Sequence, residues 1–143
     1  MVMKILLLQG ECPYPPIKGP HTHSMGVIRC LLEQNDTELT VFGYVDGEKD
    51  KARWDKFTND FGSVNVQITQ TRSGLLLKAF SLIALLTGSL PVVAICPKKP
   101  IIELVRSLNG KKFDFVMLDR YLTFFDLAIL EAKKVFLPHD AYS

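Results

Sequence analysis

The sequence lacks a strong excess of charge of either sign. Seventeen lysines and arginines stand against fifteen aspartates and glutamates, which gives a net charge of +2. Binding driven by nucleic-acid phosphates needs a concentrated basic face, so we expect no nucleic-acid partner. The 143 residues, of which 48% are apolar, are enough to bury one core of ordinary domain size.

Cysteine is also scarce. The three cysteines, Cys12, Cys30 and Cys96, form no C-x-x-C pair. This number and spacing argue against a disulfide framework and a cysteine zinc site, and they favour a reducing compartment. The N-terminus shows no small-residue cleavage site of the secretory kind. We therefore expect a cytoplasmic protein without a signal peptide.

No apolar run is long enough to span a bilayer. The most apolar stretch, residues 74–91, is interrupted by Lys78 and falls short of the roughly 20 residues that a spanning helix needs. Residues 75–86 could rest on a membrane, but packing in the protein core is the favoured interpretation. An anionic lipid surface would suit the nearby cations, although solvated faces commonly carry such charges: Lys98, Lys99, Arg106, Lys111 and Lys112.

The common phosphate-binding motifs are missing too. No G-x-G-x-x-G follows the first predicted strand, and no P-loop lysine is present. In their place stands a long loop, residues 10–23, in which Pro13, Pro15 and Pro16 form a stiff arm and Gly19 allows close approach of a ligand. The amides that begin the following helix would favour an anion such as a phosphate. A plain surface loop, stiffened by its prolines, is the alternative.

Strands and helices alternate along the rest of the chain. Apolar or alternating runs predict strands at residues 4–9, 39–45, 64–69, 113–118 and 135–137. Helical spacing of apolar residues predicts helices from about residue 22 or 24 to 33, then at residues 47–61, 74–91, 100–108 and 122–132. This alternation predicts an α/β fold, a Rossmann-like three-layer sandwich with a parallel sheet of about five strands in the order 3-2-1-4-5.

Ligands of such sheets bind beyond the carboxyl ends of the strands, where the strand order reverses. Three segments are predicted to meet there: the loop of residues 10–23, the Asp119-Arg120 pair after the fourth strand, and the His139-Asp140 pair after the fifth. His21 and His23 have a spacing that could ligate a metal, but no third ligand is evident, so no metal site is expected.

Three segments carry a resemblance to a known family. The first segment is residues 3–44 with its "PYPP" loop, the second is "SLPVVAICPKKPIIELVRSLNGKKFDFVMLD" and the third is the terminal "VFLPHDAYS". Together they resemble the N-terminal domain of family 4 glycosyltransferases of the GT-B fold. The resemblance implies an enzyme of the hexosyltransferase type in polysaccharide biosynthesis. It would transfer a sugar from a nucleotide-sugar donor to a glycan or lipid-linked acceptor with retention of configuration, without a metal or cofactor.

The resemblance also implies a division of labour between two domains. Residues 1–143 correspond to the acceptor-side domain, and the C-terminal donor-binding domain is absent from this chain, which would be inactive alone. A peripheral position at the inner face of the membrane would fit a lipid-linked acceptor, which residues 75–86 could bind as acceptor-side helices of similar enzymes do. The cations that follow this stretch would suit an anionic acceptor.

The resemblance assigns roles to single residues. Gly19 matches the first glycine of a Gly-Gly pair near the donor phosphates, whereas Pro20 stands at the second position and offers no amide. His139 matches a histidine that faces the donor sugar, where it would act in catalysis. The expected substrate-binding residues are Gly19, Pro20, His21, Asp119, Arg120 and Asp140.

A function of a different class stays open at this point. The same alternation of strands and helices would suit a non-catalytic module of flavodoxin-like architecture that binds a nucleotide or a protein.

Overall fold

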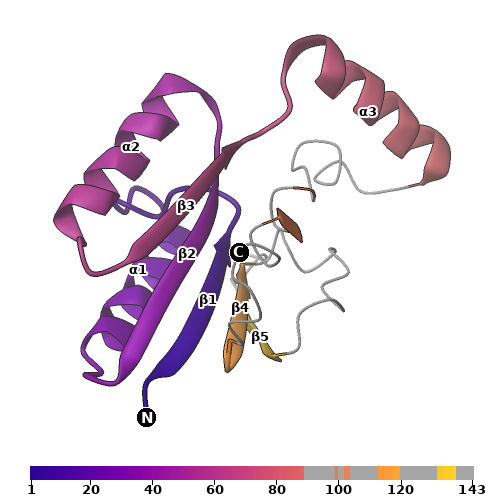
Figure 1. The fold of residues 1–143 in the computed structure, drawn as a ribbon. Helices are drawn as coiled ribbons and strands as arrows, with labels where there is room; N and C mark the ends of the chain where they lie inside the picture. Colours follow the sequence, from indigo (N-terminus) through magenta and orange to yellow (C-terminus); the bar gives the residue numbers. More distant parts are fainter. Residues whose placement is uncertain (89–98, 100–101, 104–112, 120–131, 138–143) are drawn as a thin grey trace.

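A computed structural model describes residues 1–88, 99, 102–103, 113–119 and 132–137 of the chain (Figure 1). The elements alternate between strand and helix over most of this length. They are β1 (Met3–Gln9), α1 (Gly19–Leu32), β2 (Thr37–Val45), α2 (Gly47–Asp60), β3 (Asn65–Gln70), α3 (Gly74–Thr87), β4 (Phe115–Asp119) and β5 (Lys133–Leu137). The predicted helices at residues 100–108 and 122–132 lie almost wholly outside the described residues.

The strands form a single parallel sheet, as the alternation of elements predicts. The order is β3-β2-β1-β4-β5, and all four pairings are parallel. β1 is central, between β2 and β4, which fits its run of buried leucines and its near-continuous apolar sequence. The predicted Rossmann-like α/β fold is confirmed. A flavodoxin-like sheet has the order 2-1-3-4-5 instead, so that architecture is excluded.

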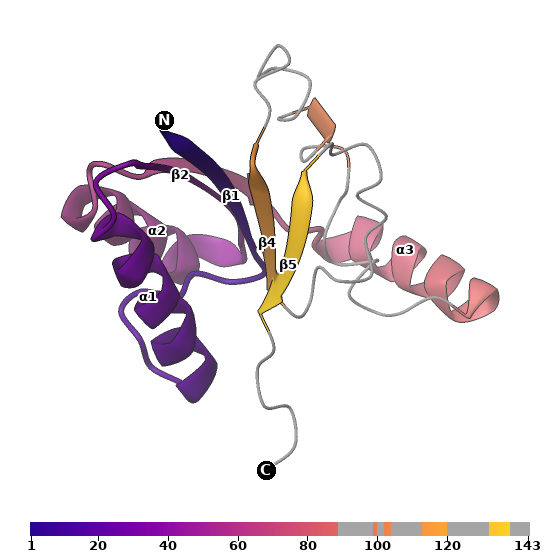
Figure 2. The same ribbon diagram turned by 90° about the horizontal axis from the view of Figure 1, so that it is seen from below.

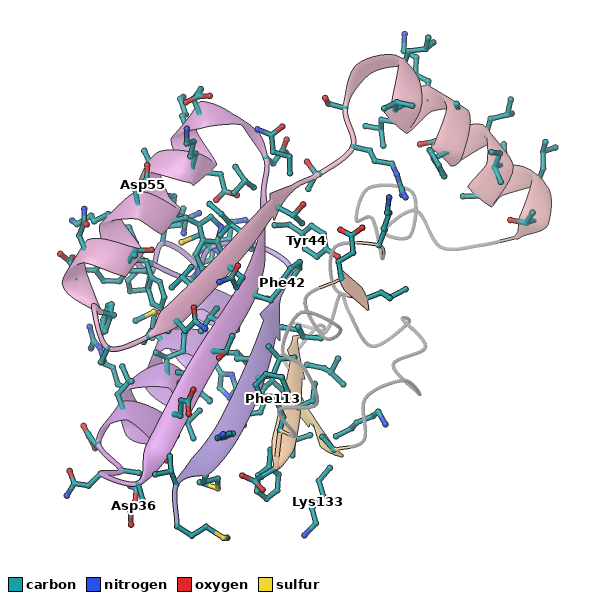
Figure 3. The ribbon with its side chains drawn as sticks, viewed as in Figure 1. Asp36, Phe42, Tyr44, Asp55, Phe113 and Lys133 are labelled. Carbon is teal, nitrogen blue, oxygen red and sulfur yellow. The ribbon has the colours of Figure 1, made fainter. Side chains whose placement is uncertain are left out.

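Helices α1 and α2 cover one face of the sheet, and α3 lies on the opposite side (Figure 2). Alternate residues of β1, Ile5 and Leu7, pack into the core on the α1–α2 face together with Met25 and Ile28 of α1. The opposite face carries Phe42 and Tyr44, which point away from α1 and α2 (Figure 3). Their rings meet edge to face, with centroids 5.5 Å apart. Both faces of the central strands are therefore buried, as the sequence predicts.

Helix α2 is held to the sheet by its aromatic side chains. Trp54 and Phe57 are fully buried, and their spacing of three residues puts both on the core face of the helix. The Trp54 indole N–H donates a hydrogen bond to the Tyr44 carbonyl at 3.0 Å. The ring also lies directly on Gly43, where a Cβ atom would come within 2.0 Å of it. Only glycine at position 43 allows this approach of helix to sheet.

Strand β3 is an edge strand, which confirms the prediction from its alternating sequence. It pairs only with β2 among the described strands. Ile68 keeps 42% of its surface exposed, and the polar residues between the apolar ones are exposed as well.

Two predictions about local structure need correction. Helix α1 begins at Gly19, earlier than residue 22, because proline is well suited to a first helical turn, where its missing N–H costs no hydrogen bond. The interpretation of residues 75–86 as a core helix is also wrong. Within α3 only Ala84 is buried, and all of its large apolar side chains except the partly buried Leu77 are exposed.

Candidate functional site

The strand order reverses between β1 and β4. From β1 the chain crosses to β2 on one side, whereas β4 lies on the other side of β1 and continues to β5. β1 and β4 are adjacent and in register from Ile5 with Phe115 to Leu8 with Leu118, so Gln9 and Asp119 end the two strands at the same edge. Connections that diverge in this way leave a crevice for ligands beyond the carboxyl ends of the strands.

The loop of residues 10–18 leads from β1 directly into the first turn of α1. Lys18 has extended backbone angles, and its carbonyl accepts the first helical hydrogen bond from the Thr22 N–H at 3.1 Å. Gly19 and Pro20 thus form the first turn of the helix. A Cβ added at Gly19 would meet no atom of the chain within 4 Å, so no contact in the fold requires glycine there.

Charged side chains gather beneath this loop. The loop cluster, as we call it, consists of Glu11, His21, Asp50 and Arg53. His21 is 2% exposed, and its Nε2 lies 3.1 Å from Glu11 Oε1, although the ring N–H is poorly aligned with that oxygen. Arg53 Nη1 lies 3.7 Å from Asp50 Oδ1, one turn earlier on α2. The cluster joins the loop, α1 and α2.

Arg53 binds the backbone of the loop as well. Its Nη2 donates to the Cys12 carbonyl at 2.5 Å and to the Pro15 carbonyl at 3.3 Å. Proline-rich loops offer carbonyls but few N–H groups, so a guanidinium with several donors is well matched to this backbone. Arg53 therefore fastens the loop to α2.

The neighbours of His21 assign its proton. The Ile17 N–H points to Nδ1 at 3.5 Å, and Arg53 Nη2 lies 3.4 Å from the same atom. Arginine and a backbone N–H can only donate, so Nδ1 acts as an acceptor and the ring proton belongs on Nε2, facing Glu11. Nδ1 of His21 is thus approached by two donors, and Nε2 faces Glu11 Oε1 at 3.1 Å without a well-aligned hydrogen bond.

The environment of the cluster shifts three pKa values. Burial alone would raise the pKa of Glu11, but the contact with the His21 ring and the charge of Lys18 hold it below its usual value. Burial raises the pKa of Asp50, in part offset by the hydrogen bond from the Asp46 N–H. Burial also raises the pKa of the Cys12 thiol to about 11, so this thiol is protonated and unreactive at neutral pH.

Gln9 adds a second polar group at this edge. It lies on the same face of β1 as Ile5 and Leu7, because alternate residues of a strand share a face. The residue is 1% exposed, and its Nε2 has no hydrogen-bond partner among the residues that the structure describes. A buried donor without a partner is costly, which marks Gln9 as a residue for mutational study.

Sequence reasoning missed Gln9, Glu11 and Arg53. For Gln9 the signal was a polar side chain at the end of an otherwise apolar strand. For Glu11 and Arg53 no local pattern exists, since they meet His21 only through the fold.

The predicted site residues have different outcomes. Gly19, Pro20 and His21 share the first turn of α1 at the predicted edge, with His21 buried beneath the loop. The backbone of Asp119 ends β4 at the same edge. Arg120, His139 and Asp140 lie outside the described residues.

Two further observations concern metals and relatives. Across residues 1–88 and the shorter described segments, no group of three or more His, Cys, Asp or Glu side chains is arranged to hold a metal ion. In comparisons with known proteins, no family model matches the chain and no curated protein matches its sequence.

Proposed function

We propose that this chain is the acceptor-side domain of a retaining glycosyltransferase that uses a nucleotide-sugar donor. The observation that supports the proposal is the reversal of strand order between β1 and β4. It puts the loop of residues 10–18, the first turn of α1 and the end of β4 at one edge of the sheet, where α/β enzymes bind their ligands. The resemblance of residues 3–44 to family 4 glycosyltransferases suggests the reaction class.

The local chemistry of that edge suits a sugar substrate. The first turn of α1 presents helix amides, and Gly19 leaves the backbone open to close approach. Arg53 and the Glu11–His21 pair fix the loop beside this turn, so a substrate meets a preformed wall. In this proposal His139 hydrogen-bonds the donor sugar and stabilises developing charge, and Asp119, Arg120 and Asp140 complete the substrate contacts.

The proposal requires a donor-binding domain in addition to these 143 residues. Closure of the two domains would exclude water from the activated sugar and so favour transfer over hydrolysis. No cofactor or metal takes part, and the nucleotide sugar is a substrate.

Replacement of Gly19 tests the proposed site. The protein that combines this domain with its donor-binding domain is incubated with a panel of UDP-, GDP- and ADP-sugars, and release of nucleoside diphosphate is measured. We expect Gly19→Leu to lower turnover about tenfold or more, which is about 1.4 kcal/mol of transition-state stabilisation. Gly26→Leu is the matched control, because Gly26 lies in the same helix and also has no atom within 4 Å of an added Cβ.

Two outcomes would contradict the proposal. One is no release from any nucleotide sugar by a folded protein. The other is equal loss of turnover in both glycine variants, which would indicate an effect on the helix instead of the site. Wild-type turnover in His139→Ala would remove the role given to His139.

The rival function, a non-catalytic binding module, is tested with the 143-residue chain itself. Its flavodoxin-like form is already excluded by the strand order. Calorimetric titration with flavin mononucleotide should give no tight binding, and tight binding would favour the rival.

A further inference from the structure

The outer edge of β3 is a row of backbone groups without partners. In the parallel ladder of β2 and β3, the backbone groups of successive residues point alternately toward β2 and away from it. The Thr71 N–H, just after β3, donates to the Val45 carbonyl at 3.0 Å, which fixes this alternation. The N–H and C=O groups of Val66, Ile68 and Gln70 therefore face away from β2. They form no hydrogen bond with any residue that the structure describes.

Strand β3 lacks the features by which sheet edges usually avoid association. Such edges commonly carry charged side chains, proline or a bulge, or a helix covers them. The six residues of β3, NVQITQ, include no charge, proline or glycine, and they pair with β2 in unbroken register. Four of the six are exposed, and the next helix, α3, projects away from the sheet (Figures 1 and 2). A further strand can therefore reach this edge.

The two faces of β3 differ in polarity around the centre of the strand. Val66 packs against the core on the α1–α2 face, and Ile68 shares this face while it keeps 42% of its surface exposed. Asn65, Gln67 and Thr69 carry neutral polar side chains on the opposite face. There the Gln67 side-chain amide donates to Asn65 Oδ1 at 3.2 Å.

Two copies of this strand complement each other when they run antiparallel about Gln67. In this register Val66 of each copy lies opposite Ile68 of the other, and Asn65 lies opposite Thr69. The backbone groups of Val66 and Ile68 are those that face outward, so each such pair exchanges two hydrogen bonds. Gln67 lies opposite Gln67 of the second copy, in the closer, non-hydrogen-bonded type of pair. Apolar side chains thus meet on one face of the joined sheet and neutral polar side chains on the other.

We infer that β3 pairs antiparallel with β3 of a second copy of this chain, so that the two sheets form one continuous sheet. The contact uses the same edge of both copies, and such an isologous pairing stops at a dimer. An extended peptide of another protein could also add a strand to an edge, but a second copy already supplies matching side chains on both faces without an unpaired charge. Strand β2 lies between β3 and β1, so the inference does not depend on the enzymatic function proposed for the β1–β4 edge.

Charges at position 67 test the register. Wild-type protein should show a concentration-dependent dimer in sedimentation velocity. Gln67→Lys and Gln67→Glu should each raise the dissociation constant about fivefold or more, because like charges then face each other across the twofold axis. An equimolar mixture of the two variants should regain the dimer, since a lysine then faces a glutamate. Gln34→Lys and Gln34→Glu are the matched controls, because Gln34 is exposed in the turn before β2 and its replacement should leave the dimer unchanged.

A proline at position 68 tests the backbone contribution. Ile68→Pro removes an N–H that faces away from β2, so the hydrogen bonds between β2 and β3 stay in place. We expect this variant to lose the dimer while its circular dichroism spectrum stays that of wild type.

Three outcomes would overturn the inference. One is a single monomeric species of wild-type protein at every concentration. Another is a dimer that the Gln67 and Ile68 variants leave intact but Leu82→Glu abolishes, since Leu82 is exposed on α3 and the contact would then belong to that helix. The third is loss of the dimer in both charge variants without recovery in their mixture, which would contradict the antiparallel register about Gln67.

Discussion

At the scale of single residues, Gly43 shows how the absence of a side chain positions a helix. Trp54 of α2 rests on the backbone of β2 at this glycine, and its indole N–H reaches the Tyr44 carbonyl of the same strand. The contact therefore combines close packing with a hydrogen bond. Neither part would survive if the ring were displaced by a methyl group.

We predict that Gly43→Ala destabilises the fold. The added Cβ would lie 2.0 Å from the Trp54 ring, so the ring or the helix must shift, at a cost of about 1–3 kcal/mol. Urea denaturation followed by circular dichroism measures the change. Gly26→Ala is the control, because it meets no neighbour within 4 Å and improves helix propensity, so stability should rise by about 0.5–1 kcal/mol. Equal stability of the two variants would contradict the packing argument.

At the scale of elements, the loop of residues 10–18 depends on contacts far along the chain. Its carbonyls receive hydrogen bonds from Arg53 of α2, and Glu11 pairs with His21 of α1. Tyr14 of the loop also donates a hydrogen bond to Asp60, near the end of α2, at 2.6 Å. The conformation of the loop is thus determined by two helices as well as by its prolines.

We predict that Arg53→Ala loosens this loop while the sheet stays intact. The Cys12 and Pro15 carbonyls would lose their hydrogen bonds from the charged guanidinium, which should lower the stability of the loop conformation by about 1.5–3 kcal/mol. Hydrogen exchange should rise in residues 10–18 and stay unchanged in β1 and β2. Arg53→Lys should restore the protection of residues 10–18 only in part, because an ammonium group lacks the planar fork of donors that a guanidinium has.

The control for this prediction is Arg29→Ala, since Arg29 is exposed on α1. A rise in hydrogen exchange throughout the chain of Arg53→Ala would indicate global destabilisation. Protection of residues 10–18 equal to that in wild type would show that Arg53 does not hold the loop.

Elements with a strong local pattern were predictable from the sequence. The apolar run of β1 and the alternation around Val66 and Ile68 predict a central and an edge strand, and the structure confirms both. The loop cluster was not predictable, because Arg53 and His21 are 32 positions apart and no periodicity links them. For α3 the apolar composition predicted packing in the core, and this prediction is wrong. Composition alone does not specify which surface a helix packs against.

At the scale of the whole molecule, the parallel sheet brings the loop cluster and the proposed substrate edge together. The protonation of ionisable groups near this edge, such as Glu11 and Asp50, therefore makes the free energy of unfolding of the domain depend on pH. A lowered pKa at Glu11 contributes stability that is lost as the pH falls through the folded-state pKa. The raised pKa of Asp50 acts in the opposite direction, because there the folded state holds its proton more tightly. The two carboxyl groups therefore partly offset each other in acid.

No such offset arises for the two raised pKa values that matter in alkali. The folded-state pKa of Cys12 is about 11, against 9.0 for a free thiol, because the side chain is buried. The hydrogen bond to Asp60 raises the pKa of Tyr14 above 10.0. In both cases the unfolded chain loses its proton first, so stability must fall as the pH rises through the interval between the unfolded and folded values.

We therefore predict a loss of stability between pH 9 and pH 11, with Cys12 contributing up to about 2–3 kcal/mol. Urea midpoints measured across this interval give the slope. Cys12→Ala should flatten the slope, and Tyr14→Phe should flatten it further at the upper end. Cys30→Ala is the matched control, because Cys30 is exposed and its replacement should leave the slope unchanged. An identical slope in wild type and Cys12→Ala would mean that the Cys12 thiolate is tolerated in the folded protein, and hence that solvent reaches the space beneath the loop.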